Sequence, residues 1–287
     1  MLAQIIDGKA VAKMLREEIR LRLKKMQQNG LVPGLAVVLV GTDSASQIYV
    51  NNKAKACQEC GIKSQVIRLP SSTTEEELVQ LIERLNKSTN IHGILVQLPL
   101  PHQIREKVII ETIDPLKDVD GFHPINVGKL LAGNPYLIPC TPYGCLKLIE
   151  KMMPDIRGKK AVVVGRSNIV GKPMAALLLK ENATVTVCHS YTQNLAEITR
   201  TADILVVAIG KPCFITGEMI KPGAIVLDVG MNRLPSGKLA GDVDFLSASE
   251  RAGWITPVPG GVGPMTITML LENTLEAAYE QKNLLRK

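Results

Sequence analysis

A tyrosine and a lysine stand four residues apart in the segment SQIYVNNKAKAC, at Tyr49 and Lys53. Side chains at this spacing lie on one face of a helix, whereas Lys55 points elsewhere. A lysine that is partly buried on such a face can carry protons near neutral pH. Tyrosine–lysine pairs are also common on ordinary helix surfaces, so the spacing by itself leaves a catalytic role and a surface role open.

Two further segments place polar groups where ligands collect. The sequence VQLPLP puts Gln97 at the C-terminal end of a predicted parallel strand, which is the ligand-binding end of open α/β sheets. The loop KDVDGFHP carries Asp118 and Asp120, and a carboxylate there can accept two parallel N–H bonds from an amino-pyrimidine ring. For Asp118 we favour a role in capping the loop.

The segment TPVPGGVGPMT can bring its backbone close to a flat ligand, because Gly260, Gly261 and Gly263 carry no side chain. The same pattern is typical of a tight turn before a helix. The sequence therefore predicts either a binding loop or an ordinary turn at 259–263.

The segment KKAVVVGRSNIVGKPM indicates a buried strand, a glycine turn at Gly165 and a helix that begins near Gly171. A helix N-terminus favours a phosphate because its N–H groups and its dipole attract anions. The spacing of the two glycines differs from the G-x-G-x-x-G of dinucleotide-binding turns, so an ordinary strand–helix turn is an equally good interpretation.

The end of the following strand reads Val187-Cys188-His189-Ser190 and contains no acidic residue. An acid at this point holds the ribose 2′-hydroxyl of NAD in dinucleotide-binding folds and would repel a 2′-phosphate. Arg166 and Ser190 can instead bind that phosphate, so the sequence predicts NADP rather than NAD. We interpret His189 as a strand-end histidine.

The pair Cys57-x-x-Cys60 invites a metal or redox interpretation. The sequence has six cysteines, but it has no second C-x-x-C motif and no histidine at ligand spacing near this pair. The surrounding KAKACQECG is typical of a helix that ends at Gly61. We therefore predict reduced, unpaired structural cysteines and no metal site.

The hydrophobic pattern predicts an α/β protein, in which strands alternate with helices around parallel sheets. In the first half, the predicted strands are 35–40, 64–69 and 93–98, and the predicted helices are 10–28, 45–60 and 75–86. A Pro/Gly-rich passage at 114–142 is interpreted as an active-site loop and a domain crossing. In the second half, the predicted strands are 161–164, 183–188, 203–209 and 224–229, and the predicted helices are 170–181, 195–201 and 265–285.

Length and composition exclude several classes of protein. A chain of 287 residues predicts two domains, and 46% hydrophobic residues with 21% charged residues is an ordinary globular composition. The net charge of +7 permits an anionic small molecule, but aromatic residues make up only 3%, which argues against a nucleic-acid partner. No apolar run reaches the roughly 18 residues of a membrane helix, and the N-terminus lacks a secretory pattern. We therefore expect a cytoplasmic protein without a membrane partner.

Seven segments, in order along the chain, resemble the bifunctional methylenetetrahydrofolate dehydrogenase/cyclohydrolase family. They are YVNNK, VQLPLP, KDVDGFHP, PCTP, GRSNIVGKP, ATVTVCHS and TPVPGGVGPMT, and together they cover essentially the whole chain. The resemblance implies two α/β domains that flank a cleft. Residues 1–140, completed by the last helix at 265–287, form the catalytic folate-binding domain, and residues 141–264 form a Rossmann-type NADP-binding domain. It also implies a homodimer.

The resemblance further implies an activity in one-carbon metabolism: NADP-dependent oxidation of 5,10-methylenetetrahydrofolate to the methenyl cation, then hydrolysis to 10-formyltetrahydrofolate. Lys53 matches the catalytic lysine, Gln97 the glutamine that tunes it, and Tyr49 and Asp120 the residues beside the pterin. The implied substrate contacts are Tyr49, Lys53, Val96, Gln97, Leu98, Asp120, Pro259, Gly260, Gly261, Val262 and Gly263. The implied cofactor contacts are Thr141, Gly165, Arg166, Ser167, Val170, Ser190, Gly210 and Met231.

Two other functions compete with this one. An NADP dehydrogenase of a small hydroxy acid, such as shikimate, would explain the second half but not the loop around Asp120. A non-catalytic NADP- or folate-binding module would not need Lys53 beside Tyr49 and Gln97.

Overall fold

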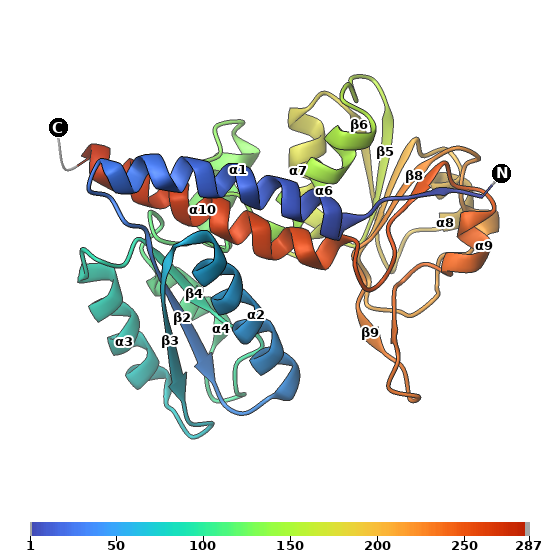
Figure 1. The fold of residues 1–287 in the computed structure, drawn as a ribbon. Helices are drawn as coiled ribbons and strands as arrows, with labels where there is room; N and C mark the ends of the chain where they lie inside the picture. The colour runs from blue at the N-terminus through green and yellow to red at the C-terminus, as the bar shows by residue number, and fades with distance from the viewer. Residues whose placement is uncertain (1, 285–287) are drawn as a thin grey trace. The chain divides into compact units, whose positions relative to one another are not determined.

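A computed structural model gives the structure of the protein and describes residues 2–284. The chain forms two compact units. The first, which we call the three-stranded unit, contains Met14–Cys140 and the chain from Ile267 onward, and the second, the six-stranded unit, contains the chain up to Lys13 and Thr141–Thr266. Helices α1 (Gly8–Gln28) and α10 (Val262–Leu284) each contribute to both units (Figure 1).

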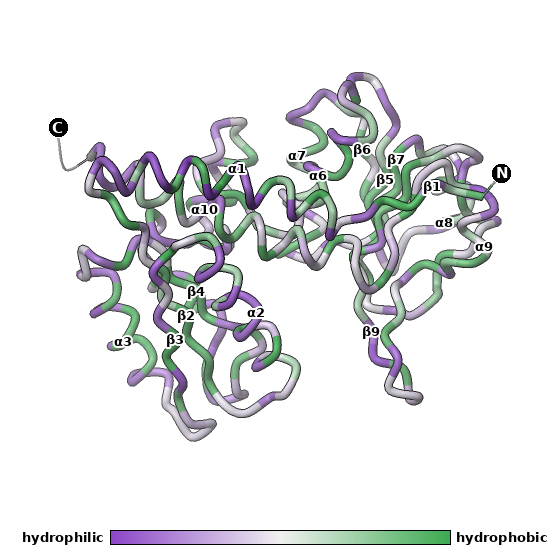
Figure 2. Tube along the Cα trace, viewed as in Figure 1, coloured by the Kyte–Doolittle hydropathy of each residue, from purple (hydrophilic) through white to green (hydrophobic). Residues whose placement is uncertain are grey.

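The three-stranded unit is built on a parallel sheet with the strand order β3-β2-β4. All seven residues of the central strand β2 are buried, as expected of an apolar run covered on both faces, and Figure 2 shows this strand as hydrophobic. Its strands are β2 (Gly34–Val40), β3 (Lys63–Leu69) and β4 (Gly93–Val96). Its shorter helices are α2 (Ser44–Cys60), α3 (Glu75–Lys87), α4 (Glu106–Thr112) and α5 (Pro124–Leu131).

Local sequence sets the start of α3. The segment SSTTEEE offers three possible capping boxes, and the structure uses the last of them. The Thr74 hydroxyl accepts the N–H of Glu77 at 3.2 Å, and the Glu77 carboxylate accepts the N–H of Thr74 at 2.8 Å.

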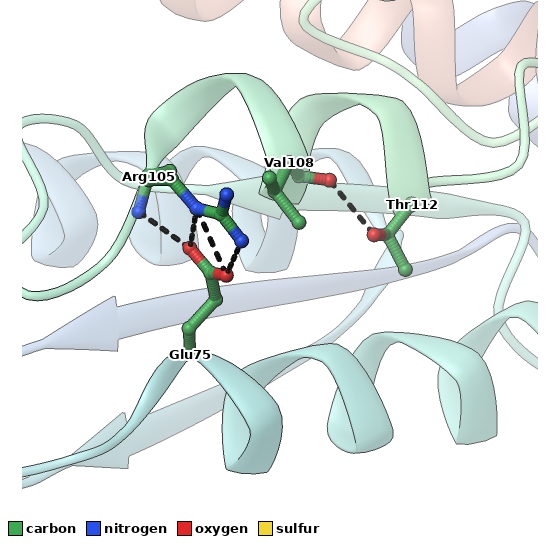
Figure 3. Close-up of polar contacts among 4 residues, drawn as sticks. All are labelled: Glu75, Arg105, Val108 and Thr112. Carbon is green, nitrogen blue, oxygen red and sulfur yellow. Dashed lines mark hydrogen bonds and ion pairs between the residues drawn. The ribbon is translucent and has the colours of Figure 1, made fainter.

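Helix α4 is tied to the first turn of α3 by an ion pair between Arg105 and Glu75 (Figure 3). The Arg105 backbone N–H also donates to the Glu75 carboxylate at 2.8 Å. The guanidinium hydrogen bond lowers the pKa of Glu75 to about 2. Because Arg105 is exposed, we expect this pair to orient the two helices more than it stabilises the unit.

The six-stranded unit is built on a sheet whose six strands are all parallel, in the order β1-β11-β8-β7-β5-β6. Its strands are β1 (Gln4–Ile5), β5 (Lys160–Val164), β6 (Thr184–Cys188), β7 (Ile204–Val207), β8 (Ile225–Asp228) and β11 (Trp254–Ile255). Its helices are α6 (Cys140–Met152), α7 (Gly171–Lys180), α8 (Leu195–Thr199), α9 (Phe245–Ser249) and the 3-10 turn η1 (Gly217–Met219). A small hairpin of β9 (Asn232–Arg233) and β10 (Leu239–Ala240) follows β8.

The predicted α/β class with parallel sheets is confirmed, and four local features of the structure differ from the prediction. The first residues belong to the six-stranded unit, because β1 pairs with β11. The passage 114–142 is not wholly irregular, since it contains α5 and the start of α6, and α4 was not predicted. The last helix begins at Val262 rather than Met265; its predicted end at 285 lies outside the described residues.

A buried lysine fixes the C-terminal end of α3. The Lys117 ammonium donates to the carbonyls of Leu85, Asn86 and Ser88 at 3.2, 2.7 and 2.7 Å. Burial lowers the pKa of Lys117. Replacing Lys117 with methionine should reduce the free energy of unfolding by about 2–3 kcal/mol, because three carbonyls at a helix end lose their charged donor. Urea denaturation measures this.

Lys87 supplies the matched control, since it lies in the last turn of the same helix but is exposed. Replacing Lys87 with methionine should change the free energy of unfolding by less than about 0.5 kcal/mol. Equal effects of the two substitutions would contradict the assigned role of Lys117.

Candidate active site

Helix α2 presents the predicted tyrosine and lysine. Asp43 starts the helix by accepting the N–H of Ser46 at 2.7 Å. Lys53 is only 7% exposed, whereas Lys55 lies on the exposed face. Tyr49 is half-buried, and burial raises the pKa of its hydroxyl. The helical spacing therefore places Lys53 inside the unit, one turn from Tyr49.

The buried lysine meets the glutamine that follows β4. The Lys53 ammonium nitrogen donates to Gln97 Oε1 at 3.0 Å. Gln97 Nε2 donates to the Leu98 carbonyl at 2.7 Å, which fixes the orientation of the amide and keeps its oxygen toward the lysine. The backbone N–H of Gln97 continues the sheet by donating to Val38 at 2.8 Å. At this end of the sheet, the hydrogen-bond acceptor of the Lys53 ammonium is therefore a neutral amide oxygen and not a carboxylate.

Asp120 lies close enough to Lys53 for the lysine charge to affect its pKa, although the hydrogen-bond partner of Lys53 is Gln97. Asp120 is partly buried, and burial raises its pKa to about 6. The positive charge of Lys53 opposes that rise, and the negative charge of Asp118 adds to it. A carboxylate with this pKa is mostly ionised at pH 7 and mostly protonated at pH 5.

Asp118 caps the loop, as the sequence predicted. Its carboxylate accepts the backbone N–H groups of Phe122 at 3.2 Å and His123 at 2.8 Å, and the side-chain amide of Asn126 at 2.9 Å. Asp118 is buried, and burial raises its pKa. Because all three donors belong to the loop and to α5, Asp118 shapes the segment that carries Asp120.

A residue of α10 also holds this loop, and the sequence analysis missed it. The Asn273 side-chain amide donates to the carbonyls of Val119 and Ile138, both at 2.8 Å. Gly121 has a φ of 74°, and a Cβ there would lie 2.6 Å from the carbonyl carbon of Ile138. Asp120 therefore stands between two fixed backbone points. No local pattern could indicate Asn273, because its partners Val119 and Ile138 lie 154 and 135 residues earlier in the chain.

In the six-stranded unit, the turn after β5 needs both of its glycines. Gly165 has a φ of 127°, and a Cβ there would lie 2.2 Å from the Ala208 carbonyl oxygen. A Cβ on Gly171 would lie 2.2 Å from the Gly165 carbonyl oxygen. The turn therefore brings three backbone segments together at the start of α7, as dinucleotide-binding turns do.

Ser167 caps the start of α7. Its hydroxyl oxygen accepts the N–H groups of Val170 at 3.1 Å and Gly171 at 3.3 Å. The sequence predicted that N–H groups at this helix start would be free to bind a phosphate. In the structure, those of Val170 and Gly171 already donate to the Ser167 hydroxyl.

Exposed residues surround the end of β6. Arg166 and Ser190 are both exposed, and the Arg166 guanidinium lies 5.5 Å from the centre of the Tyr191 ring. His189 Nδ1 accepts the N–H of Tyr191 at 3.2 Å, so this histidine shapes the turn, as predicted. The strand end offers a cation and a hydroxyl but no acid, which fits a dinucleotide that carries a 2′-phosphate.

Three other predicted cofactor positions lie in this unit. Gly210 follows β7 and Met231 follows β8, at the C-terminal end of the sheet. The Thr141 hydroxyl lies 3.0 Å from that of Thr266.

The segment 259–263 forms a turn that leads directly into α10. The Gly261 N–H donates to the Pro257 carbonyl at 2.9 Å, which makes a turn, and Gly260 has a φ of 114°. Val262 and Gly263 are already in the first turn of α10. All five residues belong to the six-stranded unit, whereas Lys53 belongs to the three-stranded unit.

The six cysteines are free thiols, and all but Cys213 are buried, as predicted for structural cysteines. Burial raises the pKa of Cys57 to about 12, which makes its thiol unreactive. Among residues 2–284, no three His, Cys, Asp or Glu side chains form a group that could hold a metal ion. No helix in this described range has the length and apolarity that a membrane span requires.

These features define an α/β enzyme with a Rossmann-type dinucleotide unit and a buried lysine–glutamine pair beside a carboxylate. Two family descriptions match the chain: the tetrahydrofolate dehydrogenase/cyclohydrolase catalytic domain over residues 6–120, and the NAD(P)-binding domain of the same family over residues 139–282. The chain belongs to the tetrahydrofolate dehydrogenase/cyclohydrolase family.

Known relatives match nearly the whole chain. The bifunctional protein FolD of Moorella thermoacetica is 60% identical, over 97% of this chain and 99% of its own. The structure of the bifunctional FolD methylenetetrahydrofolate dehydrogenase/cyclohydrolase of Campylobacter jejuni has a TM-score of 0.95 at 51% identity, covering 97% of this chain and 99% of its own. A Trypanosoma brucei FolD structure, complexed with NADP cofactor and an inhibitor, has a TM-score of 0.94 at 42% identity, covering 98% and 99%.

The comparisons confirm the family resemblance that the sequence motifs indicated. They also confirm a bifunctional dehydrogenase/cyclohydrolase that acts on folates and uses a nicotinamide dinucleotide. The hydroxy-acid dehydrogenase and the non-catalytic module are not favoured, because both halves of the chain match this one family.

Proposed function

We propose that the protein oxidises 5,10-methylenetetrahydrofolate with NADP and hydrolyses the resulting methenyl cation to 10-formyltetrahydrofolate. The observation that carries the proposal is the 3.0 Å hydrogen bond from buried Lys53 to half-buried Gln97, near a carboxylate whose pKa is raised to about 6 by burial. A lysine held inside a protein by a neutral amide, rather than by an ion pair, is suited to moving protons.

The two chemical steps make different demands on these residues. When bound, the cofactor accepts the hydride from the one-carbon bridge, a step in which the protein mainly has to position the two partners. In the second step, water adds to the cationic carbon and the bond from that carbon to N5 breaks. Lys53 takes one proton from the attacking water and gives one to N5 as that bond breaks. The second proton of the water, lost when the hydroxyl becomes the formyl carbonyl, leaves to solvent. Gln97 keeps the amine oriented through its fixed amide.

We assign the following folate-side contacts. Asp120 accepts the N–H groups of the pterin ring and Tyr49 packs beside it. Val96 and Leu98 flank Gln97 at the sheet end, and Pro259, Gly260, Gly261, Val262 and Gly263 supply backbone.

We assign NADP selectivity to Arg166 and Ser190, which are exposed at the ends of β5 and β6 where no acid stands. The remaining cofactor contacts in this proposal are Thr141, Gly165, Ser167, Val170, Gly210 and Met231, all in the six-stranded unit.

A spectrophotometric assay with 5,10-methylenetetrahydrofolate, run in parallel with NADP and NAD, tests this function. Turnover with NADP and little build-up of the methenyl intermediate is the expected result. Acid quenching separates the overlapping spectra of reduced cofactor and methenyl product. Strong methenyl accumulation would contradict the cyclohydrolase half, and the absence of turnover with either cofactor would contradict the whole proposal.

Because Asp120 titrates in the working pH range, the proposed activity should depend on pH. Because burial raises the pKa of Asp120 to about 6, kcat/KM for the folate should fall below pH 6, approaching tenfold per pH unit. Protonation removes the anionic acceptor for the pterin N–H groups. Replacing Asp120 with asparagine should remove this acid limb and raise KM, and an acid limb that persists unchanged in the variant would assign the titration to another group.

We also propose a homodimer. Strand β6 lies at the edge of its sheet, and Thr184, Thr186 and Val187 are exposed along it. An unpaired edge of this kind is a natural surface for a second copy of the chain. Light scattering should report about twice the 31.2 kDa of one chain, and a mass near 31.2 kDa would refute the dimer.

We also propose that the protein is cytoplasmic and has no nucleic-acid or membrane partner. Five buried, unpaired cysteines suit a reducing compartment. Cell fractionation followed by immunodetection would test the location.

A further inference from the structure

Two carboxylates are buried in the six-stranded unit and have no role in the chemistry proposed above. Asp242 is 0% exposed and Asp228 is 4% exposed. Asp242 Oδ2 accepts the backbone N–H groups of Ile209 at 2.7 Å and Gly210 at 2.9 Å, and Oδ1 accepts the side-chain amide of Asn232 at 2.8 Å. The hydrogen bonds of Asp242 thus run to two different loops.

Asp228 interlocks with Asp242. Its Oδ1 accepts the N–H groups of Gly230 at 3.0 Å and Asp242 at 2.9 Å, and its Oδ2 accepts the N–H of Val243 at 2.9 Å. The packing leaves no spare room, since a Cβ on Gly230 would lie 2.3 Å from Asp242 Cγ. The two carboxylates and their loops therefore form one rigid arrangement.

The loops held by Asp242 lie at the C-terminal end of the parallel sheet. Ile209 and Gly210 follow β7. Asn232 is the first residue of β9 and comes directly after Met231, which lies in the loop that follows β8. Ligands of open parallel sheets bind at this end. The segment that carries Asp242 is itself anchored, because its carbonyl accepts the N–H of Ile215 at 3.0 Å.

We propose that Asp242 and Asn232 are positioning residues that set the cofactor side of the site, by fixing the two loops that carry Gly210 and Met231. This inference rests on the cofactor roles that the proposed function gives to those two loops. A carboxylate suits position 242 because its two oxygens together accept three N–H groups: one oxygen accepts those of Ile209 and Gly210, and the other accepts the Asn232 amide.

Exchanging the two residues tests the proposal. Asn232→Asp alone sets a second carboxylate against Asp242, and at pH 8 the like charges should push the loops apart. Asp242→Asn alone should have a smaller effect than Asn232→Asp. Asn232 can turn its amide to present an oxygen, and it then loses only its 3.3 Å hydrogen bond to the Ala240 carbonyl. The double variant Asn232→Asp with Asp242→Asn restores an amide–carboxylate pair, and the amide oxygen introduced at position 242 can still accept from Ile209 and Gly210.

Two readouts separate positioning from general stability: the Kd for NADPH, measured by fluorescence, and amide hydrogen exchange at Ile209 and Gly210 in protein without cofactor. We expect Asn232→Asp to raise the Kd at least tenfold and to speed exchange at both amides. The double variant should return the Kd to within threefold of the wild type and restore the slow exchange. Should Asn232→Asp fail to fold, the double variant and Asp242→Asn still give both readouts.

Asp244 provides the matched control. It lies two residues from Asp242 and accepts the Ser247 hydroxyl at 2.7 Å. Asp244→Asn removes the same charge but should leave the Kd and the two exchange rates unchanged.

The proposal is overturned if the double variant binds NADPH as weakly as Asn232→Asp. It is also overturned if exchange at Ile209 and Gly210 speeds up while the Kd stays constant, because the loops would then not matter to the cofactor. A wild-type protein that fails to bind NADPH would refute the proposed function itself, which the wild-type measurement reveals before any variant is compared.

Discussion

Replacing Lys53 with methionine should lower the cyclohydrolase rate by about 100-fold to 10,000-fold while leaving part of the dehydrogenase activity. The side chain keeps its length and its buried position, but it loses the amine that moves protons between water and N5. Hydride transfer needs no proton carrier, so we expect the dehydrogenase to fall by about tenfold or less, through altered positioning. The methenyl intermediate should therefore accumulate.

The measurement is the ratio of methenyl intermediate to reduced cofactor in the same reaction. Lys55→Met is the matched control, because Lys55 lies on the exposed face of the same helix, and both activities should be retained. Methionine at position 53 leaves Gln97 Oε1 without its donor, which costs about 1–3 kcal/mol, so thermal unfolding should be measured alongside. Undiminished cyclohydrolase activity in Lys53→Met would remove Lys53 from the mechanism.

Replacing Arg166 with alanine should lower the preference for NADP over NAD by about 10-fold to 100-fold. A charge-assisted hydrogen bond to a phosphate contributes about 1.5–3 kcal/mol, and 1.4 kcal/mol is a factor of ten in affinity. The loss should fall on the KM for NADP, while NAD, which lacks the 2′-phosphate, should be used as before. Ser190→Ala should shift the preference in the same direction by a smaller factor, because a neutral hydroxyl binds the phosphate more weakly.

The ratio of kcat/KM for NADP to that for NAD is the quantity to measure. Arg157→Ala controls for the loss of a surface cation, because Arg157 is exposed in the same unit and pairs with Asp155 at 2.8 Å. An unchanged ratio in Arg166→Ala would mean that the 2′-phosphate is recognised elsewhere. Weaker binding of both cofactors to the same degree would instead assign Arg166 to a shared part of the nucleotide.

Local patterns predicted most of the elements, because each depends on residues close together in the chain. The apolar run at 35–40 needs burial on both faces, and the structure places it at the centre of the three-stranded sheet. Helix α2 ends at Gly61, whose φ of 90° lies in the left-handed region that favours glycine. Errors occurred where a segment depends on a distant partner, as in β1, whose two residues form a strand only beside β11.

The sequence by itself determined the family, the alternation of strands and helices, and the shared helix face of Tyr49 and Lys53. Motifs and periodicity are properties of neighbouring residues, so they can be read without a fold. The tertiary structure decided that Gln97 holds Lys53 through a fixed amide, that Asn273 fixes the Asp120 loop, and that Asp242 joins two strand-end loops. These contacts depend on side-chain direction and packing between segments that are far apart in the chain, which no local spacing specifies.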